Sequence, residues 1–179
     1  MTSDHALLEN YRNGDEGALS ELLDRYQRPL YGFIYRMVGN HADTADLCQK
    51  SFFQAFRKAG TFEWRSNFKT WLYRIAVNLT RNHIRSLKRD PTVPFPNHRP
   101  LEEVPAATPA TDPVVSGEEK KLLRTAIEGL PEKQRTTLML KVYQELTFEE
   151  VAGVMGCPVG TAKANYHHAL SSLRKRLKG

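Results

Sequence analysis

The chain has 179 residues, which allows one domain or two small ones, and an apolar content of 40% argues against global disorder. Its formal net charge is +6, with basic side chains in excess over residues 1–89 and 118–179 and acidic ones over residues 90–117. Two basic blocks around an acidic spacer favour two separate contacts with a polyanion. No membrane-length apolar run, signal pattern, or zinc or redox cysteine spacing is present. We therefore expect a cytoplasmic protein without cofactor or membrane insertion.

Helical periodicity dominates the N-terminal third, and no alternating strand pattern competes with it. A short helix is predicted around residues 7–11 and is expected to end at Gly14. Two more helices are predicted, over residues 18–26 and 30–38, and the second is expected to end at Gly39. This part of the chain is therefore expected to be an all-α bundle.

A further helix is predicted from Asp43, its expected N-cap, to about residue 59. Its expected apolar face contains Ala45, Cys48, Phe52, Ala55, Phe56 and Ala59. Asp46, Gln49 and Phe53 fall at helical spacing on another side. An ordinary solvated face gives the same pattern, so periodicity alone leaves the role of these three residues open.

The stretch from Phe62 to Arg89 predicts a loop and then a helix, with Ser66 or Asn67 as N-cap. One stripe of the helix is apolar: Phe68, Leu72, Ile75, Ala76 and Leu79. A second stripe combines an aromatic side chain with amides and cations: Trp71, Arg74, Asn78, Arg81, Asn82 and Arg85. Such side chains stack on bases and bind phosphates, which favours a nucleic acid as ligand. The alternative is that Phe68 and Trp71 belong to the core and that the cations are only solvated.

Most of the prolines lie between residues 90 and 117. Proline removes a backbone donor and fixes φ, so an extended linker is expected there rather than a packed element. The sequence thus predicts an all-α protein of two small helical domains, residues 1–89 and 118–179, joined by a Pro-rich linker.

After the linker, one helix is predicted to end near Gly129, and residues 147–178 have the pattern of a helix-turn-helix. Thr147 and Glu150 have the form of a capping box, and Gly156 supplies a left-handed turn. The next helix is expected to bury Val159, Ala162, Tyr166, Ala169, Leu173 and Leu177. In this geometry the second helix presents its N-terminal residues to the major groove of DNA.

Polar and small residues occupy the outward positions early in that second helix: Thr161, Lys163, Ala164, Asn165, His167 and His168. Asparagine can pair with adenine, and lysine with guanine or phosphate. A basic end suits further phosphate contacts: Arg174, Lys175, Arg176 and Lys178. The adjacent histidines have no Cys or Asp partners nearby in sequence, so no metal site is predicted there.

Three segments in this order resemble the extracytoplasmic-function (ECF) sigma factors, the smallest sigma-70 family initiation subunits of bacterial RNA polymerase. Residues 43–52, DTADLCQKSF, are similar to the family segment A-E-D-L-x-Q-E-x-F. Residues 68–78, FKTWLYRIAVN, with Arg85 downstream, are similar to F-x-T-W-L-x-R-I-A-x-N. Residues 159–163, VGTAK, with LRKRL at 173–177, are similar to V-G-T-V-K and its basic continuation.

The resemblance covers about residues 10–89 and 118–178, and it implies a sigma factor rather than an enzyme. Such a protein directs promoter-specific initiation by binding core polymerase, recognising the −35 and −10 elements and stabilising melted −10 DNA.

The implied polymerase-binding residues are Asp46, Gln49 and Phe53. The loop implied to capture a flipped −10 base contains Phe62, Trp64, Arg65 and Asn67. The residues implied to contact the melting duplex are Trp71, Arg74, Asn78, Arg81, Asn82 and Arg85. The implied −35 readers are Thr161, Lys163, Ala164, Asn165, His167, His168 and Arg174. The implied partners are core RNA polymerase through its β′ clamp helices and β flap, promoter DNA, and an anti-sigma factor.

This chain departs from the family pattern in its −35 reader. Ala164, Asn165 and His168 stand where Ser, Arg and Arg are often found, which suggests a different −35 sequence or more dependence on polymerase. A stand-alone helix-turn-helix regulator is an alternative, but it leaves Asp46 and the Trp71 helix without a role. An enzyme is disfavoured because the sequence has no metal-ligand cluster, no nucleophile with a base and no glycine-rich phosphate loop. A module that binds only proteins would have no salt-dependent DNA affinity.

Overall fold

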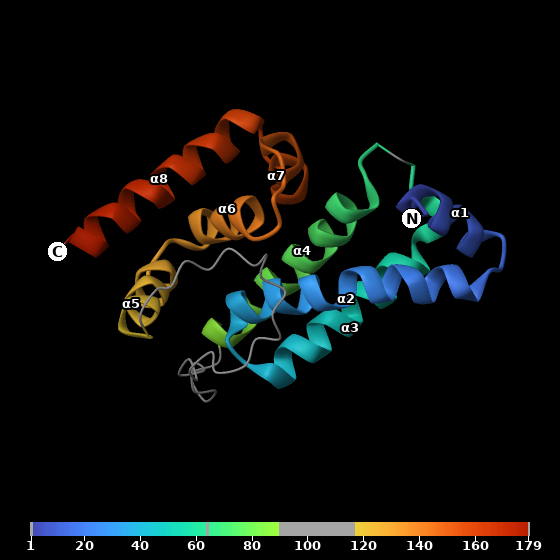
Figure 1. The fold of residues 1–179 in the computed structure, drawn as a ribbon, viewed down its shortest axis with the longest axis horizontal. Coiled ribbons are helices and arrows are strands. Elements are labelled where there is room, and N and C mark those ends of the chain that lie inside the picture. The colour runs from blue at the N-terminus through green and yellow to red at the C-terminus, as the bar shows by residue number, and fades with distance from the viewer. Residues whose placement is uncertain (1, 64, 90–116, 179) are drawn as a thin grey trace. The chain divides into compact units, whose positions relative to one another are not determined.

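The computed structural model describes residues 2–63, 65–89 and 117–178, and in these ranges all regular structure is helical (Figure 1). The chain divides into two compact units, residues 1–107 and 108–179. The first contains α1 (Asp4–Arg12), α2 (Glu16–Val38), α3 (His41–Arg57), the 3-10 turn η1 (Ala59–Thr61) and α4 (Phe68–Arg89). The second contains α5 (Gly117–Glu128), α6 (Glu132–Val142), α7 (Phe148–Met155) and α8 (Val159–Lys178). The predicted linker, apart from Gly117, lies outside the described residues.

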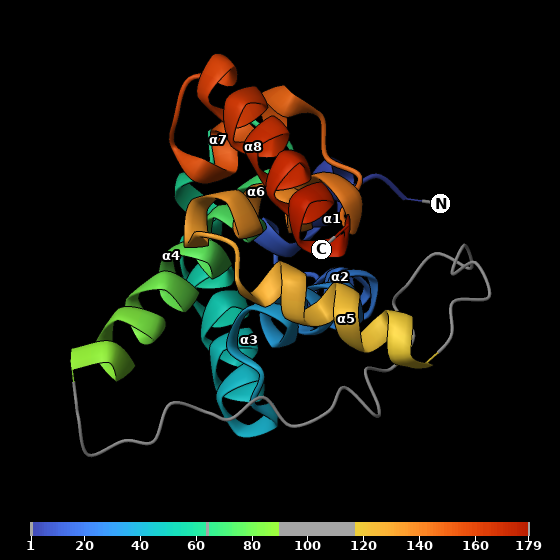
Figure 2. The ribbon, with the colours of Figure 1, turned by 90° about the vertical axis from the view of Figure 1, so that its left-hand side faces the viewer.

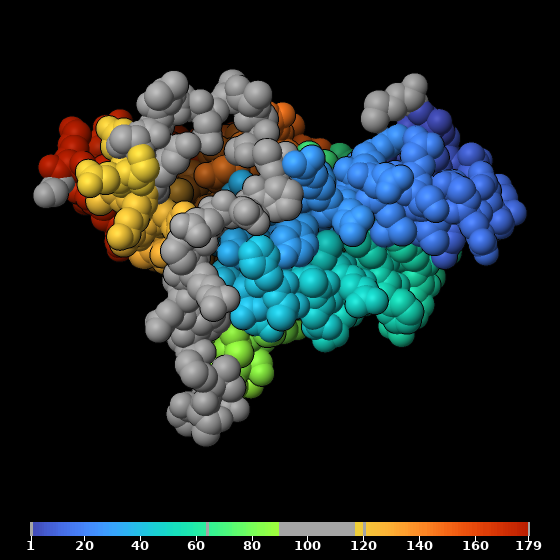
Figure 3. Space-filling model, turned by 60° about the horizontal axis from the view of Figure 1, so that its bottom comes forward, coloured from blue at the N-terminus to red at the C-terminus, as the bar shows by residue number. Residues whose placement is uncertain are grey.

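In the first unit, α2 packs against α1, α3 and α4, and α3 packs against α4. Figure 3 shows α2 (blue) and α3 (cyan) side by side. The core is built from fully buried side chains of the three long helices and of α1, including Leu8, Leu22, Phe33, Phe68 and Tyr73. Because one face of each long helix is used in this core, the opposite faces of α3 and α4 are left to solvent.

The prediction of separate helices over residues 18–26 and 30–38 is wrong, because α2 runs through both and contains Pro29. Proline lacks the N–H for one helical hydrogen bond and normally bends or breaks a helix. Tyr26 and Leu30, on either side of it, are both buried, and the Tyr26 ring lies 5.5 Å from that of Phe68. Packing of the continuous apolar face therefore outweighs the lost hydrogen bond.

The N-terminus of α3 also differs from the prediction. Asn40, not Asp43, is the N-cap, and its side chain accepts a hydrogen bond from the backbone N–H of Asp43 at 3.0 Å. The buried face of α3 is turned accordingly: Ala45, expected in the core, is exposed, whereas Thr44 and Leu47 are buried. Two good capping residues lie within four positions, and the left-handed Gly39 that ends α2 favours the earlier one.

In the described part of the second unit, residues 117–178, α8 packs against α5, α6 and α7. One of its core clusters joins α5, α6 and α8: Ala126, Leu130, Leu138, Ala169 and Leu173. The predicted capping box at Thr147 and Glu150 is confirmed, as is the left-handed Gly156 after α7, with φ of 63°. Leu177, expected to be buried, is 42% exposed, and Val159 and Tyr166 are only partly buried.

Glu145, in the turn between α6 and α7, has a positive φ of 54°, the one non-glycine residue of the described chain with that conformation. An L-residue in this region costs about 1–2 kcal/mol, and glycine escapes that cost at the expense of unfolded-state entropy. We expect Glu145→Gly to stabilise the protein by about 0.5–1 kcal/mol and to raise its urea midpoint by circular dichroism. Glu145→Ala, which stays strained, is the control, and a lower midpoint for the glycine variant would contradict the assignment.

Candidate nucleic-acid and protein interfaces

The outward face of α4 carries the predicted polar stripe. Arg74, Asn78, Asn82 and Arg85 are exposed, and Trp71 and Arg81 are partly buried. Between these positions His83 turns the other way, with its Nε2 3.3 Å from the Asp43 carboxylate of α3. The C-terminal turns of α4, in light green, project beyond α2 and α3 (Figure 2). The helix thus presents amides and guanidinium groups to solvent on a rigid support.

An aromatic cluster forms the N-terminal end of this face. Phe68 is 1% exposed and therefore belongs to the core. For this residue, the core interpretation left open by the sequence is the correct one. Trp71 is partly buried and lies between two rings: its centroid is 4.5 Å from that of Phe62, in a stacked arrangement, and 6.0 Å from that of Phe68. Phe62 is itself 8% exposed. Phe62 is therefore a packing partner of Trp71 rather than an exposed loop aromatic.

The loop before α4 is fixed at both ends. At its end, the Asn67 side chain accepts a hydrogen bond from the backbone N–H of Thr70 at 2.7 Å, so the predicted cap is confirmed at Asn67. At its start, the carbonyl of Phe62 accepts a hydrogen bond from Arg12 of α1 at 2.7 Å. Between them, Arg65 and Glu63 are exposed and form an ion pair at 2.8 Å. Trp64 lies outside the described residues.

Arg12 was missed by sequence reasoning. It lies 50 residues before its Phe62 partner, and an arginine at the end of a short helix has no local signature that indicates a distant carbonyl. No pattern of spacing could have found this contact.

The outward face of α3 carries the three residues predicted to bind polymerase. Asp46 and Gln49 are exposed, and Phe53 is 65% exposed, the largest value among the exposed large apolar side chains described. The Arg57 guanidinium lies 5.8 Å from the centre of the Phe53 ring, and Lys50 forms an ion pair with Asp46 at 2.6 Å. Charged and amide groups thus surround one exposed aromatic ring.

A groove of about 470 Å³ adjoins these residues, between α2 and α3. It is lined by Leu23, Gln27, Ala45, Cys48, Gln49, Phe52, Phe53 and Phe56. Burial raises the pKa of the Cys48 thiol to about 11. The thiol is therefore protonated at neutral pH, and thiols react as thiolates, so Cys48 contributes to the groove as a small apolar group.

In the second unit, α7 and α8 form the predicted helix-turn-helix. Early in α8 the exposed positions are Thr161, Lys163, Ala164, His167 and His168, and Asn165 is partly buried. Phe148, at the start of α7, supports this end of α8. Its ring centroid lies 5.0 Å from Lys141 Nζ, 5.9 Å from Lys163 Nζ and 5.5 Å from that of Tyr166. Sequence reasoning did not single out Phe148, because its partners come from two other helices.

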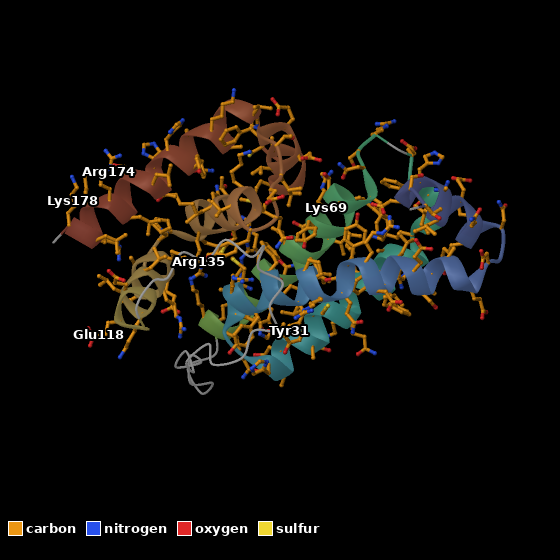
Figure 4. All side chains as sticks on the ribbon, in the orientation of Figure 1. Tyr31, Lys69, Glu118, Arg135, Arg174 and Lys178 are labelled. Carbon is orange, nitrogen blue, oxygen red and sulfur yellow. The ribbon has the colours of Figure 1, made fainter. Side chains whose placement is uncertain are left out.

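The basic C-terminal half of α8 divides into two roles. Arg174 and Lys178 point outward on the side of α8 away from α6 (Figure 4). Arg176 instead donates a hydrogen bond to the carbonyl of Gly129 at 2.9 Å and so ties α8 to the end of α5. Gly129 allows this approach, since a Cβ there would lie 2.1 Å from the Arg176 guanidinium. Arg174 and Lys178 are therefore the better candidates for phosphate contacts.

Two further observations concern other classes of site. Over residues 2–63, 65–89 and 117–178, no three His, Cys, Asp or Glu side chains gather into a group that could bind a metal ion. Among the helices described in these ranges, none combines the length and the apolar character needed to cross a membrane.

Comparison with known families matches both units. The family described as Sigma-70 region 2 matches residues 22–90, and the family described as Sigma-70, region 4 matches residues 120–173. The chain belongs to the sigma-70 family. It is 33% identical to the ECF RNA polymerase sigma factor SigW of Bacillus subtilis, over 96% of this chain and 95% of the relative. It is 31% identical to the ECF RNA polymerase sigma-E factor of Escherichia coli K12, over 98% and 95% of the two chains.

Solved structures share the fold of this sigma factor. CnrH, in complex with the cytosolic domain of CnrY, matches with a TM-score of 0.75 and 19% identity over 99% of this chain and 98% of that chain. The sigma factor RpoE of Bartonella quintana, in complex with the anti-sigma factor NepR, matches with a TM-score of 0.69 and 24% identity over 89% and 96%. The two family matches and the full-length likeness to curated ECF sigma factors make the chain an ECF RNA polymerase sigma factor, a subunit that directs promoter-specific initiation of transcription.

Proposed function

We propose that this sigma factor acts through three surfaces, one for core polymerase and two for promoter DNA. The proposal assigns α3 to core polymerase, α4 and its preceding loop to the −10 element, and α8 to the −35 element. One observation carries it: each family match includes a helix with polar and basic side chains on its outward face. These helices are α4, with its amides and arginines, and α8, with Lys163 early in the helix and Arg174 and Lys178 just beyond residue 173, where the match ends.

Docking on polymerase is assigned to Asp46, Gln49 and Phe53. An exposed aromatic ring beside polar groups suits a protein interface, where one aromatic anchor often supplies much of the binding energy. The β′ clamp helices are the partner that the family resemblance implies for this face. For the second unit, the resemblance implies the β flap.

Promoter opening is assigned to the face of α4. Melting a duplex costs stacking energy, and stacking a freed base on an aromatic side chain returns about 1–3 kcal/mol per base. Trp71 packs against Phe62 and Phe68 and is partly open to solvent, which supports assigning it this stacking role. The protein can therefore hold melted DNA without hydrolysing any nucleotide. On the same stripe, phosphate contacts are supplied by Arg74, Arg81 and Arg85, so the affinity for DNA decreases as the salt concentration rises.

Recognition of the −35 element is assigned to the first turns of α8, from Thr161 to His168. Lys163 and Asn165 are the two side chains there with strong base-reading chemistry. Arg174 follows as a phosphate contact. An anti-sigma factor is proposed as a further partner that covers the polymerase-binding face when the protein is idle, and the site of action is the bacterial cytoplasm.

The test is transcription from genomic DNA fragments by core bacterial RNA polymerase, with and without the purified chain, followed by mapping of the RNA starts. New start sites that appear only with the chain, and that share −35 and −10 sequences upstream, are expected. Unchanged core activity, together with specific duplex binding by the chain alone, would instead establish the stand-alone helix-turn-helix regulator. That alternative accounts only for residues 118–179 and leaves the region 2 match over 22–90 without a role.

Replacing Arg174 and Asn165 separates positioning from reading at the −35 element. Arg174→Ala is expected to weaken holoenzyme binding about equally on all promoters and to reduce the slope of log affinity against log salt by about 1. Asn165→Ala is expected to leave that slope unchanged. It is expected to lose about 1–3 kcal/mol of binding free energy only on promoters that carry the base pair read by Asn165. Competition binding over a −35 base series at several salt concentrations measures both. A lower salt slope for Asn165→Ala would contradict the assignment.

A further inference from the structure

We propose that Arg12 of α1 is a positioning residue for promoter melting. It holds the start of the loop at residues 62–67 in the arrangement that captures a −10 base. The inference rests on the proposed function of this loop. It extends that function to α1, which lies outside residues 22–90 matched by Sigma-70 region 2.

The Arg12 guanidinium reaches two backbone carbonyls at the entrance to the loop. Its Nε donates to the Ala59 carbonyl at 2.8 Å, and its Nη2 donates to the same oxygen and to the Phe62 carbonyl, the latter at 2.7 Å. These two carbonyls lie at the start of η1 and immediately after it. The planar fork of arginine suits such paired acceptors, and bonds from a charged donor are stronger than neutral ones.

The rest of α1 holds Arg12 in place. Glu9 accepts a hydrogen bond from Nη1 of Arg12 at 2.6 Å and orients the guanidinium. The Tyr11 ring packs edge-on against Phe56 of α3, with centroids 5.5 Å apart, and Leu7 and Leu8 are buried. A side chain anchored in this way loses little further freedom when it binds the loop, so it acts as a fixed support.

Through Phe62, the Arg12 contact is linked directly to Trp71 on the outward face of α4. Phe62, whose carbonyl Arg12 binds, stacks its ring on Trp71 at 4.5 Å. Asn67 fixes the other end of the loop by capping α4. Glu63, Arg65 and Ser66, the described exposed residues between these two anchors, therefore start from a defined position, and loss of one anchor leaves them to sample other conformations.

The test measures capture of single bases by the holoenzyme. Core polymerase with the chain is titrated with single-stranded −10 oligonucleotides taken from mapped start sites. In a matched series, each base in turn is replaced by an abasic site. The wild-type chain is expected to show one position where the intact base strengthens binding. The measured quantity is the ratio of the affinity for the intact oligonucleotide to the affinity for the oligonucleotide that is abasic at this position. Arg12→Met, which keeps the length of the stem, is expected to reduce this ratio about tenfold. Arg12→Lys, which can serve one carbonyl at a time, is expected to give an intermediate ratio.

The matched control is Arg28→Met, the same substitution at an exposed arginine of α2 that takes no part in the loop contact, and it is expected to keep the wild-type ratio. Hydrogen exchange of the free chain provides a second readout: in Arg12→Met the amides of residues 61–63 are expected to exchange faster while those of α2 are unchanged. If Arg12→Met does not fold, Arg12→Lys is measured in both assays and carries the test.

The outcomes distinguish failure of the proposed role of Arg12 from failure of the proposed function of the loop. A wild-type ratio in a folded Arg12 variant overturns the role of Arg12 and leaves the proposed loop intact. Weaker binding of Arg12→Met to all oligonucleotides alike, or lost affinity for core polymerase, also overturns it, because either indicates general damage. Absence of any base-dependent position with the wild-type chain overturns the proposed function of the loop, and the inference with it.

Discussion

Phe53→Ala is expected to weaken binding of this sigma factor to core RNA polymerase by about 30-fold, or about 2 kcal/mol, as for the truncation of an aromatic anchor at an interface. The free protein should lose little stability, because the side chain is 65% exposed. Binding of a fluorescently labelled chain to core polymerase measures the affinity, and urea unfolding of the free chain measures the stability.

Ser20→Ala is the control, since Ser20 is an exposed side chain of α2 in the first unit and is assigned to none of the proposed interfaces. It is expected to leave the affinity for core polymerase unchanged. Asp46→Ala and Gln49→Ala should each weaken binding less than Phe53→Ala, because rim polar groups contribute less than a central aromatic. Wild-type affinity for all three α3 variants would remove α3 from the polymerase interface.

Local signals predicted much of the fold. The left-handed glycines, the Thr147 capping box and the apolar spacing all act within a few residues. The helices now seen as α3 and α4, and the helix-turn-helix, could therefore be located approximately from the sequence. Where the prediction for α2 failed, a longer-range effect decided. Pro29 is tolerated because packing on both sides holds α2 together, and that packing is invisible to a window of a few residues.

The candidate surfaces show the same division. The outward stripe of α4 follows from a period of 3.6 residues, so Arg74, Asn78 and Arg85 are exposed as predicted. Phe62 could not be placed in this way, because a loop has no period and its burial depends on where Trp71 lies. The Arg12 contact spans 47 residues to Ala59, and only the packing of α1 brings the two together.

Trp71→Ala is expected to reduce the fraction of open promoter complexes by about 30-fold, which corresponds to about 2 kcal/mol of lost base stacking. Permanganate footprinting of the −10 region measures the opening. Trp71→Phe, which keeps a stacking face, is expected to recover most of it. Binding to a duplex that contains only the −35 element should not change, because α8 lies in the other unit.

The stack between Phe62 and Trp71 complicates this variant, because an aromatic pair contributes about 0.5–1.5 kcal/mol to folding. Phe62→Leu separates the two effects: it removes the ring that supports Trp71 and keeps the indole. If base stacking on the indole carries the effect, Phe62→Leu should open promoters far better than Trp71→Ala at equal loss of stability. Equal defects in the two variants would mean that this end of α4 supports melting through its packing alone, and Trp71 would lose its assigned role as a stacking surface.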